Sequence, residues 1–323
     1  WLLEQNQAAL HRDLWAAGDR VRQKTRGDAI HLRALLEWSN VCSRSCDYCG
    51  LQSANTKIRR YTMTRVEMVD AAVASSNLGY TTIVLQSGEV HGLDSGELAD
   101  CIEAITQQTT MDITLSLGEH PYTDLQRWRK AGADRYLLKQ ETTNPLLYSK
   151  YHRGDDGRGR MDTLVALKEL GYIVGSGNMV GLPGQNCLDL AADLLFFQNA
   201  AVDMAAIGPF IPHPDTPLKN AKPGSLSLLL TVTALARLLL PSVWIPAVSG
   251  ASCLDPKGRE KMLSVGADTW MVSVTPSQLR EAYQLYPRSQ NQVVGTENGP
   301  PSTEDMARMF RALGRGVAKR SVA

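Results

Sequence analysis

Short runs of apolar and β-branched residues alternate along the chain with longer amphipathic segments. Near-continuous apolar runs are typical of strands that are buried on both faces of a parallel sheet, and amphipathic segments between them are typical of the connecting helices. Helices are predicted at Arg65–Leu78, Asp162–Leu170 and Leu188–Asn199. The apolar runs that predict strands are His31–Asn40, Thr81–Ser87, Asp112–Leu117, Arg135–Glu141, Tyr172–Val180, Asp203–Phe210, Trp244–Val248 and Thr269–Val274.

Eight such βα units predict a closed (β/α)8 TIM barrel, whereas six would give a partial barrel. We expect one domain over residues 1–323. Residues 1–30 form its N-terminal helical segment, in which Trp1–Lys24 is expected to cross the base of the barrel. Residues 302–323 are expected to contribute a closing helix at Ser302–Gly314.

Polar residues follow every predicted strand. Because the active sites of these barrels lie at the carboxyl ends of the strands, these residues are expected to gather at one end of the molecule. They are Cys42, Glu89, Glu119, Glu141, residues 181–185, His213, Ser249 and Thr275.

Cys42, Cys46 and Cys49 supply three thiols within eight residues, in the spacing CxxxCxxC. Four cysteines saturate a [4Fe–4S] cluster, so three leave one iron open for a small molecule. A structural zinc site would need a fourth ligand, and a disulfide would leave one cysteine over. The remaining cysteines, Cys101, Cys187 and Cys253, are isolated and are expected to pack as small apolar residues.

The aromatic residue Tyr48, directly before the third cysteine, completes a pattern that resembles the radical S-adenosylmethionine (SAM) enzymes. The resemblance implies one [4Fe–4S] cluster, held by Cys42, Cys46 and Cys49 as metal-ligating and catalytic residues, with SAM on the open iron. One electron from the cluster would then cleave SAM and release a 5′-deoxyadenosyl radical.

Several residues at the strand ends suit SAM. Ser87-Gly88-Glu89 resembles the Gly-Gly-Glu motif of these enzymes, in which glycine permits close approach and the carboxylate accepts from the SAM ammonium. Glu141 and Arg160 suit the ribose and the methionine carboxylate, although an ordinary surface ion pair is the alternative. The predicted cofactor-binding set is Tyr48, Ser87, Gly88, Glu89, Ser116, Glu141, Arg160 and Met179.

Composition and net charge limit the classes of partner that can be expected. The formal net charge of +1 gives no reason to expect nucleic acid. The longest apolar run, Leu226–Leu240, is too short and too polar to span a membrane, which takes about 20 apolar residues. An oxygen-sensitive open cluster points to the cytoplasm and to an electron donor as a partner.

Stretches that match one known family occur in the same order along nearly the whole chain, at 31–34, 48–51, 85–89, 114–119, 133–138, 179–185, 207–218 and 283–287. In these stretches the chain resembles the [FeFe]-hydrogenase maturase HydE group, which includes methylornithine synthase (PylB). The resemblance implies a deep internal cavity, a small-molecule or small metal-complex substrate, and other maturases as partners. It suggests Arg33, Thr114, Arg135 and Tyr283 as substrate-binding residues, with Lys139 where the family tends to have arginine.

Departures from the family pattern concern the substrate. Residues 290–301 lack the second cysteine trio of some HydE proteins, so one cluster is expected. Gln140, Val248-Ser249 and Ser273 replace histidine, a threonine pair and asparagine at positions expected to face the substrate. Three classes of function remain open: HydE-type maturation, a HydE-like enzyme acting on a small amino-acid-like substrate as a mutase or in sulfur chemistry, and a non-enzymatic iron–sulfur carrier.

Overall fold

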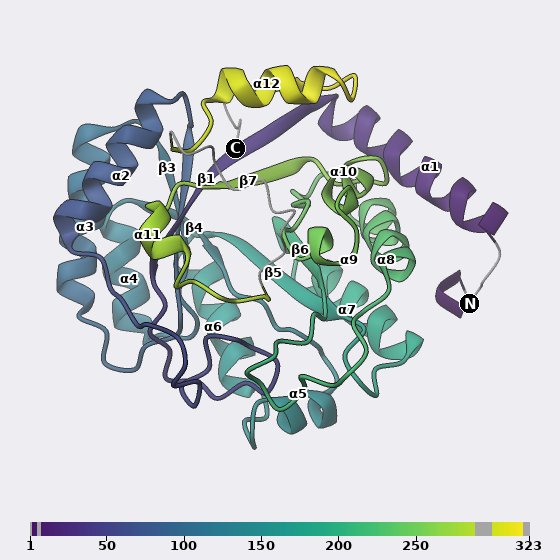
Figure 1. Cartoon of the computed structure of the whole chain (residues 1–323), viewed down its shortest axis with the longest axis horizontal. Helices are drawn as coiled ribbons and strands as arrows, with labels where there is room; N and C mark the ends of the chain where they lie inside the picture. The colour runs from purple at the N-terminus through teal and green to yellow at the C-terminus, as the bar shows by residue number, and fades with distance from the viewer. Residues whose placement is uncertain (1, 5–7, 288–298, 319–323) are drawn as a thin grey trace.

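The computed structural model describes residues 2–4, 8–287 and 299–318, and a curled parallel sheet forms its centre (Figure 1). The strand order is β6-β5-β4-β3-β2-β1-β7, so β1 to β6 lie side by side in chain order, as repeated βα units require. A short strand, β8, pairs with the start of β1. The strands are β1 (Ala29–Ser39), β2 (Thr82–Ser87), β3 (Asp112–Ser116), β4 (Ala133–Leu137), β5 (Ile173–Val180), β6 (Met204–Pro209), β7 (Thr269–Ser273) and β8 (Gly316–Val317).

Residues 244–247 close the sheet into a barrel. Trp244 forms a parallel bridge to Met204 of β6, and Pro246 forms one to Thr269 of β7. Because proline has no backbone N–H, this segment cannot continue as a regular ladder, and the strand predicted here is reduced to isolated bridges. The predicted (β/α)8 barrel is confirmed in this form.

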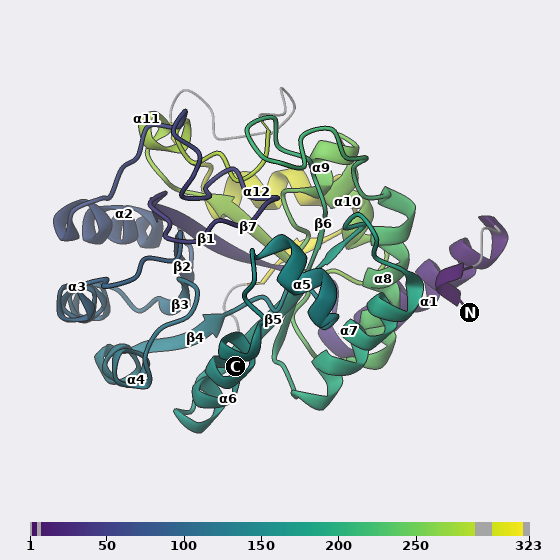
Figure 2. The same ribbon diagram turned by 90° about the horizontal axis from the view of Figure 1, so that it is seen from below.

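Helices surround the sheet on its outer face, and their apolar sides cover it (Figures 1 and 2). The predicted helix at 162–170 begins four residues earlier, and the other two begin and end within one residue of their predicted bounds. The helices are α1 (Ala8–Arg26), α2 (Arg65–Asn77), α3 (Ser95–Gln108), α4 (Tyr122–Ala131), α5 (Pro145–Tyr151), α6 (Arg158–Glu169), α7 (Cys187–Asn199), α8 (Leu226–Leu239), α9 (Ala251–Leu254), α10 (Gly258–Leu263), α11 (Ser277–Arg280) and α12 (Thr303–Arg311), with a 3₁₀ turn η1 at Leu2–Glu4.

Alternate residues of each strand face the helices or the barrel interior. On β1, Leu32, Ala34 and Leu36 are buried in the apolar core under the helices. Arg33, between them, lines an internal cavity. Since side chains alternate along a strand, Glu37 lies on the same interior face as Arg33.

The N-terminal helix differs in position from the prediction. α1 packs along α8, and the indole N–H of Trp15 donates to the Thr231 hydroxyl at 3.2 Å. The second half of the helix reaches the base of the barrel, where Gly18 packs against the Val265 carbonyl and Arg26 pairs with Asp268 at 2.8 Å. Within the described residues, no helix is both long enough and apolar enough to cross a membrane.

The fourth strand is shorter than the sequence suggests. It ends at Leu137, four residues before the predicted end at Glu141. Glu141 has a φ of 64°, in the left-handed region that non-glycine residues seldom occupy. Its amide donates to the Gly177 carbonyl at 3.0 Å, and its carbonyl accepts from the Met179 amide at 2.8 Å. The backbone therefore turns out of the sheet while it stays attached to β5.

Candidate active site

The loop that carries the three cysteines follows β1 and is held on both sides by backbone hydrogen bonds. The Ser43 amide donates to the Glu89 carbonyl at 2.7 Å, which joins the loop to the end of β2. The Asp47 amide donates to the Tyr151 carbonyl at 2.9 Å, which joins it to α5. The loop is thus fixed across the carboxyl end of the barrel, as predicted for the active site.

Gly88 is required by the packing of this loop. A Cβ atom at residue 88 would lie 2.2 Å from the Val41 carbonyl oxygen and 2.6 Å from Cβ of Cys42. The close approach that Gly88 permits in the structure is therefore to the cysteine loop itself, in addition to any approach to a ligand.

The thiols of Cys42, Cys46 and Cys49 are unpaired and partly exposed. Burial raises the pKa of all three, to about 12 for Cys46, so without a metal they are protonated at neutral pH. No set of three His, Cys, Asp or Glu side chains in the described part of the chain is placed to hold a single metal ion. Three thiols from one loop fit a cluster, because its cysteine ligands bind different irons and need not converge on one point.

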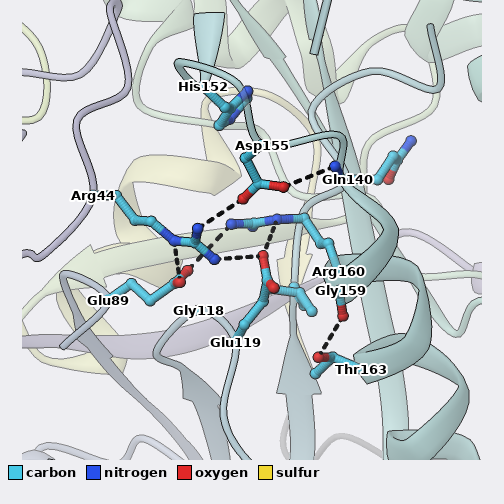
Figure 3. A network of polar contacts seen from close by, with 12 residues as sticks. Arg44, Glu89, Gly118, Glu119, Gln140, His152, Asp155, Gly159, Arg160 and Thr163 are labelled. Atoms are coloured by element: carbon cyan, nitrogen blue, oxygen red, sulfur yellow. Dashed lines mark hydrogen bonds and ion pairs between the residues drawn. The ribbon is translucent and has the colours of Figure 1, made fainter. Parts of the chain in front are cut away.

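Arg44, inside the cysteine loop, binds three carboxylates (Figure 3). It pairs with Glu89 after β2, with Glu119 after β3 at 2.9 Å, and with Asp155 before α6 at 2.7 Å. These contacts join the cysteine loop to three separate connections of the barrel. Ion pairs of this kind hold both ends in a defined geometry, because the guanidinium offers its donors in a fixed fork.

Arg160 of α6 forms the second centre of the same network. It lies 3.2 Å from both Glu89 and Glu119, and it also donates to the Tyr148 hydroxyl at 3.0 Å and to the Lys139 carbonyl at 2.9 Å. All four neighbours are in or beside the predicted SAM site. Figure 3 shows the two guanidinium groups lying side by side between the carboxylates.

The charge of the network suits a further cation. Gly118 has a φ of 86°, and a Cβ there would lie 2.2 Å from Oε2 of Glu89, so only glycine leaves the carboxylate in place. With every group ionised, three carboxylates face two guanidinium groups, which leaves one negative charge without a cation. The ammonium of SAM would balance that charge.

Tyr48 is oriented by His152. Nδ1 of His152 lies 2.9 Å from the Tyr148 carbonyl and can only donate to it, so Nε2 accepts from the Tyr48 hydroxyl at 2.8 Å. Burial lowers the pKa of His152, which keeps the imidazole neutral. Tyr48 also packs on a small apolar cluster that contains Met179, so these two predicted cofactor-binding residues lie together.

The other predicted SAM residues also lie at this end. Glu141 pairs with Lys139 at 2.9 Å. Ser87 ends β2, and its hydroxyl donates to the Gly88 carbonyl at 2.7 Å. Ser116 ends β3 and lies in register with Gln86 of β2.

Three of the predicted substrate residues lie together at the opposite, closed end of the interior. Arg33 and Thr114 line a cavity with Trp244, and the Arg33 guanidinium is 5.5 Å from the centre of the Trp244 ring. Nε and Nη2 of Arg33 and the Thr114 hydroxyl are buried without a hydrogen-bond partner in the described residues. Arg135 is 5.7 Å from the same ring but pairs with Asp112 at 2.9 Å. Nε of Arg135 is also without a hydrogen-bond partner in the described residues, but Arg33 differs in having no ion pair there.

Burial and the charge of Arg135 lower the pKa of Arg33 to about 9. It remains protonated at neutral pH, and an anionic ligand would satisfy its buried donors.

Tyr283 lies at the open end instead, where its hydroxyl accepts from the Gln86 side chain at 2.7 Å. The expectation that Gln140 faces the substrate is wrong. Gln140 is fully buried, and its side-chain carbonyl accepts from the Ser176 hydroxyl and, at 3.2 Å, from the Gly177 amide. These bonds direct it toward β5 and away from the interior.

Arg44, Asp155, Trp244 and Glu37 belong to the site but were not predicted as site residues. Arg44 had one available signal, because it lies between two of the cysteines. Glu37 had another, as the one acidic residue of the predicted strand His31–Asn40. Asp155 and Trp244 gave none, because neither lies in a motif.

Comparison with known proteins agrees with this geometry. The Radical SAM superfamily pattern matches residues 36–197. The [FeFe] hydrogenase maturase subunit HydE of Thermotoga maritima is 46% identical over 282 residues, which cover 87% of this chain and 81% of that protein. The 3-methylornithine synthase of Methanosarcina acetivorans is 27% identical, over 82% of this chain and 75% of the relative.

The crystal structure of methylornithine synthase (PylB) has the same fold, with a TM-score of 0.84 at 24% identity, over 98% of this chain and 92% of that one. The cysteine triplet and the barrel match what the superfamily needs, so the protein is an enzyme that uses a [4Fe–4S] cluster and SAM. By its identity to the Thermotoga protein over most of both chains, the chain belongs to the [FeFe] hydrogenase maturase HydE family of the radical SAM superfamily.

Proposed function

We propose that this protein acts as a HydE-type maturase, which uses SAM radical chemistry to help assemble the di-iron subcluster of an [FeFe] hydrogenase. The proposal rests on the 46% identity to HydE. The barrel agrees with it, because the cysteine loop lies over one end and Arg33 lies at the other. When bound, the cluster supplies the electron that cleaves SAM. The protein supplies an enclosed interior, in which a reactive species meets only the intended substrate.

The residues of the open end have separate roles in this proposal. Cys42, Cys46 and Cys49 hold the cluster, while Glu89 accepts from the SAM ammonium. Arg160 and Glu141 hold the methionine carboxylate and the ribose, and Tyr48 and Met179 offer an apolar surface. Ser87, Gly88 and Ser116 line the strand ends between them. At the closed end, Arg33 and Thr114 offer unpartnered donors to an anionic part of the substrate, with Arg135 beside them. Lys139 and Tyr283 contact the substrate near the opening.

Glu89→Gln should weaken SAM binding by about 1.5–3 kcal/mol, because it removes the charge from a hydrogen bond to an ammonium. The cluster should be retained, since glutamine keeps the shape of the side chain. SAM affinity is measured by anaerobic equilibrium dialysis of the reconstituted protein. Glu97→Gln, the same change on the exposed face of α3, serves as control and should bind SAM normally. Equal affinities in the two variants would reject the role of Glu89.

The function is tested by complementation. A host that lacks its own HydE but retains the other maturases and an [FeFe] hydrogenase should regain hydrogenase activity when it expresses this chain. The Cys46→Ala variant is the control and should give none. Absence of rescue by a protein that cleaves SAM would contradict the maturase proposal.

A HydE-like enzyme with an amino-acid-like substrate is the second candidate. Ser273 favours it, since this residue departs from the family pattern and lies at the open interior, where its hydroxyl donates to Glu37 at 2.6 Å. If Val248→Thr and Ser273→Asn together convert a protein that does not rescue into one that does, the second candidate is correct. The carrier class is excluded, because membership of the HydE family makes the protein an enzyme.

The proposed function also implies partners for the protein. A small-molecule or small metal-complex substrate, an electron donor and companion maturases are expected, and neither nucleic acid nor a membrane is needed. The cytoplasm and one cluster per chain remain predictions, and the cysteine-free stretch 290–301 lies mostly outside the described residues.

A further inference from the structure

Glu37 is a buried acid inside the barrel, and the roles proposed above do not use it. It belongs to β1, four residues after Arg33, on the face that points into the interior. In the parallel sheet it lies in register with Gln86, whose side chain reaches Tyr283. The carboxyl group is therefore placed beside the predicted substrate residue Tyr283 at the open end.

This part of the interior is accessible. Gln86, Ser273 and Tyr283 are only partly buried, whereas Leu36 and Ile83, which face the helices, are fully buried. A ligand that enters from the open end thus meets the side chains around Glu37.

The position of the carboxyl group is fixed by two hydroxyl groups. The Ser273 hydroxyl donates to Oε2 of Glu37 at 2.6 Å. The Thr275 hydroxyl accepts from the Glu37 amide at 2.8 Å, so its own hydrogen is free to be donated to Oε2. Both donors use the same oxygen, and within the described residues Oε1 has no hydrogen-bond partner.

Glu37 also has no cation. No ion pair involves it in the part of the chain that the structure describes, whereas Glu89, Glu141 and Asp268 are each paired with an arginine or a lysine. Arg280 approaches but donates to the carbonyls of Ser273, at 3.4 Å, and Thr275, at 2.7 Å. Burial without a counter-charge raises the pKa of Glu37, and a cationic ligand group beside it would favour the ionised carboxylate.

From this geometry we infer that Glu37 binds the amino group of the substrate through Oε1. The ligand class is a small molecule with a primary ammonium group, such as an amino acid that is free or carried on a metal complex. The inference rests on the proposed function, for which it specifies one recognised group. Glu37 is then a specificity residue, and Ser273 and Thr275 are positioning residues that hold its carboxylate.

The test uses the reconstituted holoprotein with SAM and two probes that differ only in the amino group: L-cysteine and 3-mercaptopropionate. Dissociation constants are measured anaerobically by calorimetry. Wild type should bind L-cysteine at least about tenfold more tightly than 3-mercaptopropionate. In Glu37→Gln the preference should fall to within about twofold, because the neutral amide loses its attraction for the ammonium.

Glu97→Gln serves again as the control and should keep the preference. Equal binding of the two probes by wild type overturns the inference without any variant, and so does a preference that survives in Glu37→Gln. SAM cleavage is assayed separately on the same samples. If SAM is not cleaved, the proposed function fails whatever the probes show, and if it is cleaved but the preference is absent, only the role of Glu37 fails.

Discussion

Cys46→Ala is expected to leave the protein unable to hold its cluster and unable to cleave SAM. The wild-type protein should bind about four irons and four sulfides after anaerobic reconstitution. The variant keeps only two of the three thiols in the loop, and no other His, Cys, Asp or Glu set in the described residues can take over as a metal site. Iron and sulfide content, together with production of 5′-deoxyadenosine in the presence of dithionite, measures the effect.

Cys253→Ala is the matched control. This thiol is partly buried, lies outside the cysteine loop, and should leave both the iron content and SAM cleavage unchanged. A Cys46→Ala protein with a full, SAM-cleaving cluster would show that the loop is not the cluster site.

Arg160→Met is expected to destabilise the fold by about 3–5 kcal/mol, because it leaves the buried carboxylate of Glu89 and the partly buried carboxylate of Glu119 with one fewer cation. The effect is read from the urea unfolding curve of the anaerobically purified protein. Arg158→Met is the control on the same helix, since the Arg158 side chain is 86% exposed and pairs only with the partly exposed Asp156. Exposed pairs of this kind contribute little, so the control should unfold at nearly the wild-type urea concentration.

Equal unfolding curves for the two arginine variants would mean that the charge network of Figure 3 does not stabilise the fold. The role of Arg160 in binding SAM would then have to be tested by affinity alone.

The barrel was predictable because its strands are largely apolar, as β2 illustrates, where Ile83 and Leu85 belong to the core under the helices and Val84 lines the interior cavity. The sequence did not show where backbone geometry departs from that pattern. The run through Glu141 looks like one continuous strand, but a left-handed residue ends it early. The seventh run is apolar, yet Pro246 limits it to isolated bridges.

The candidate site was predictable to the extent that its residues lie in local motifs. The cysteine triplet and Gly88-Glu89 are short motifs, so a few neighbouring residues are enough to identify each of them. The partners of Arg44 come from three separate connections, and Asp155 lies 111 positions away in the chain. A charged residue in a loop looks the same in sequence whether it is solvated or paired, so this network could not be predicted. Glu37 was overlooked because strand burial was judged for the whole run and not face by face.

The central claim is that one three-cysteine cluster at the end of the barrel binds SAM through an open iron. The most direct measurement is the EPR spectrum of the reduced, reconstituted protein with and without SAM. We expect the signal of a single [4Fe–4S] cluster, and this signal should change when SAM is added. A signal that SAM leaves unaltered, or the signal of a second cluster, would contradict it.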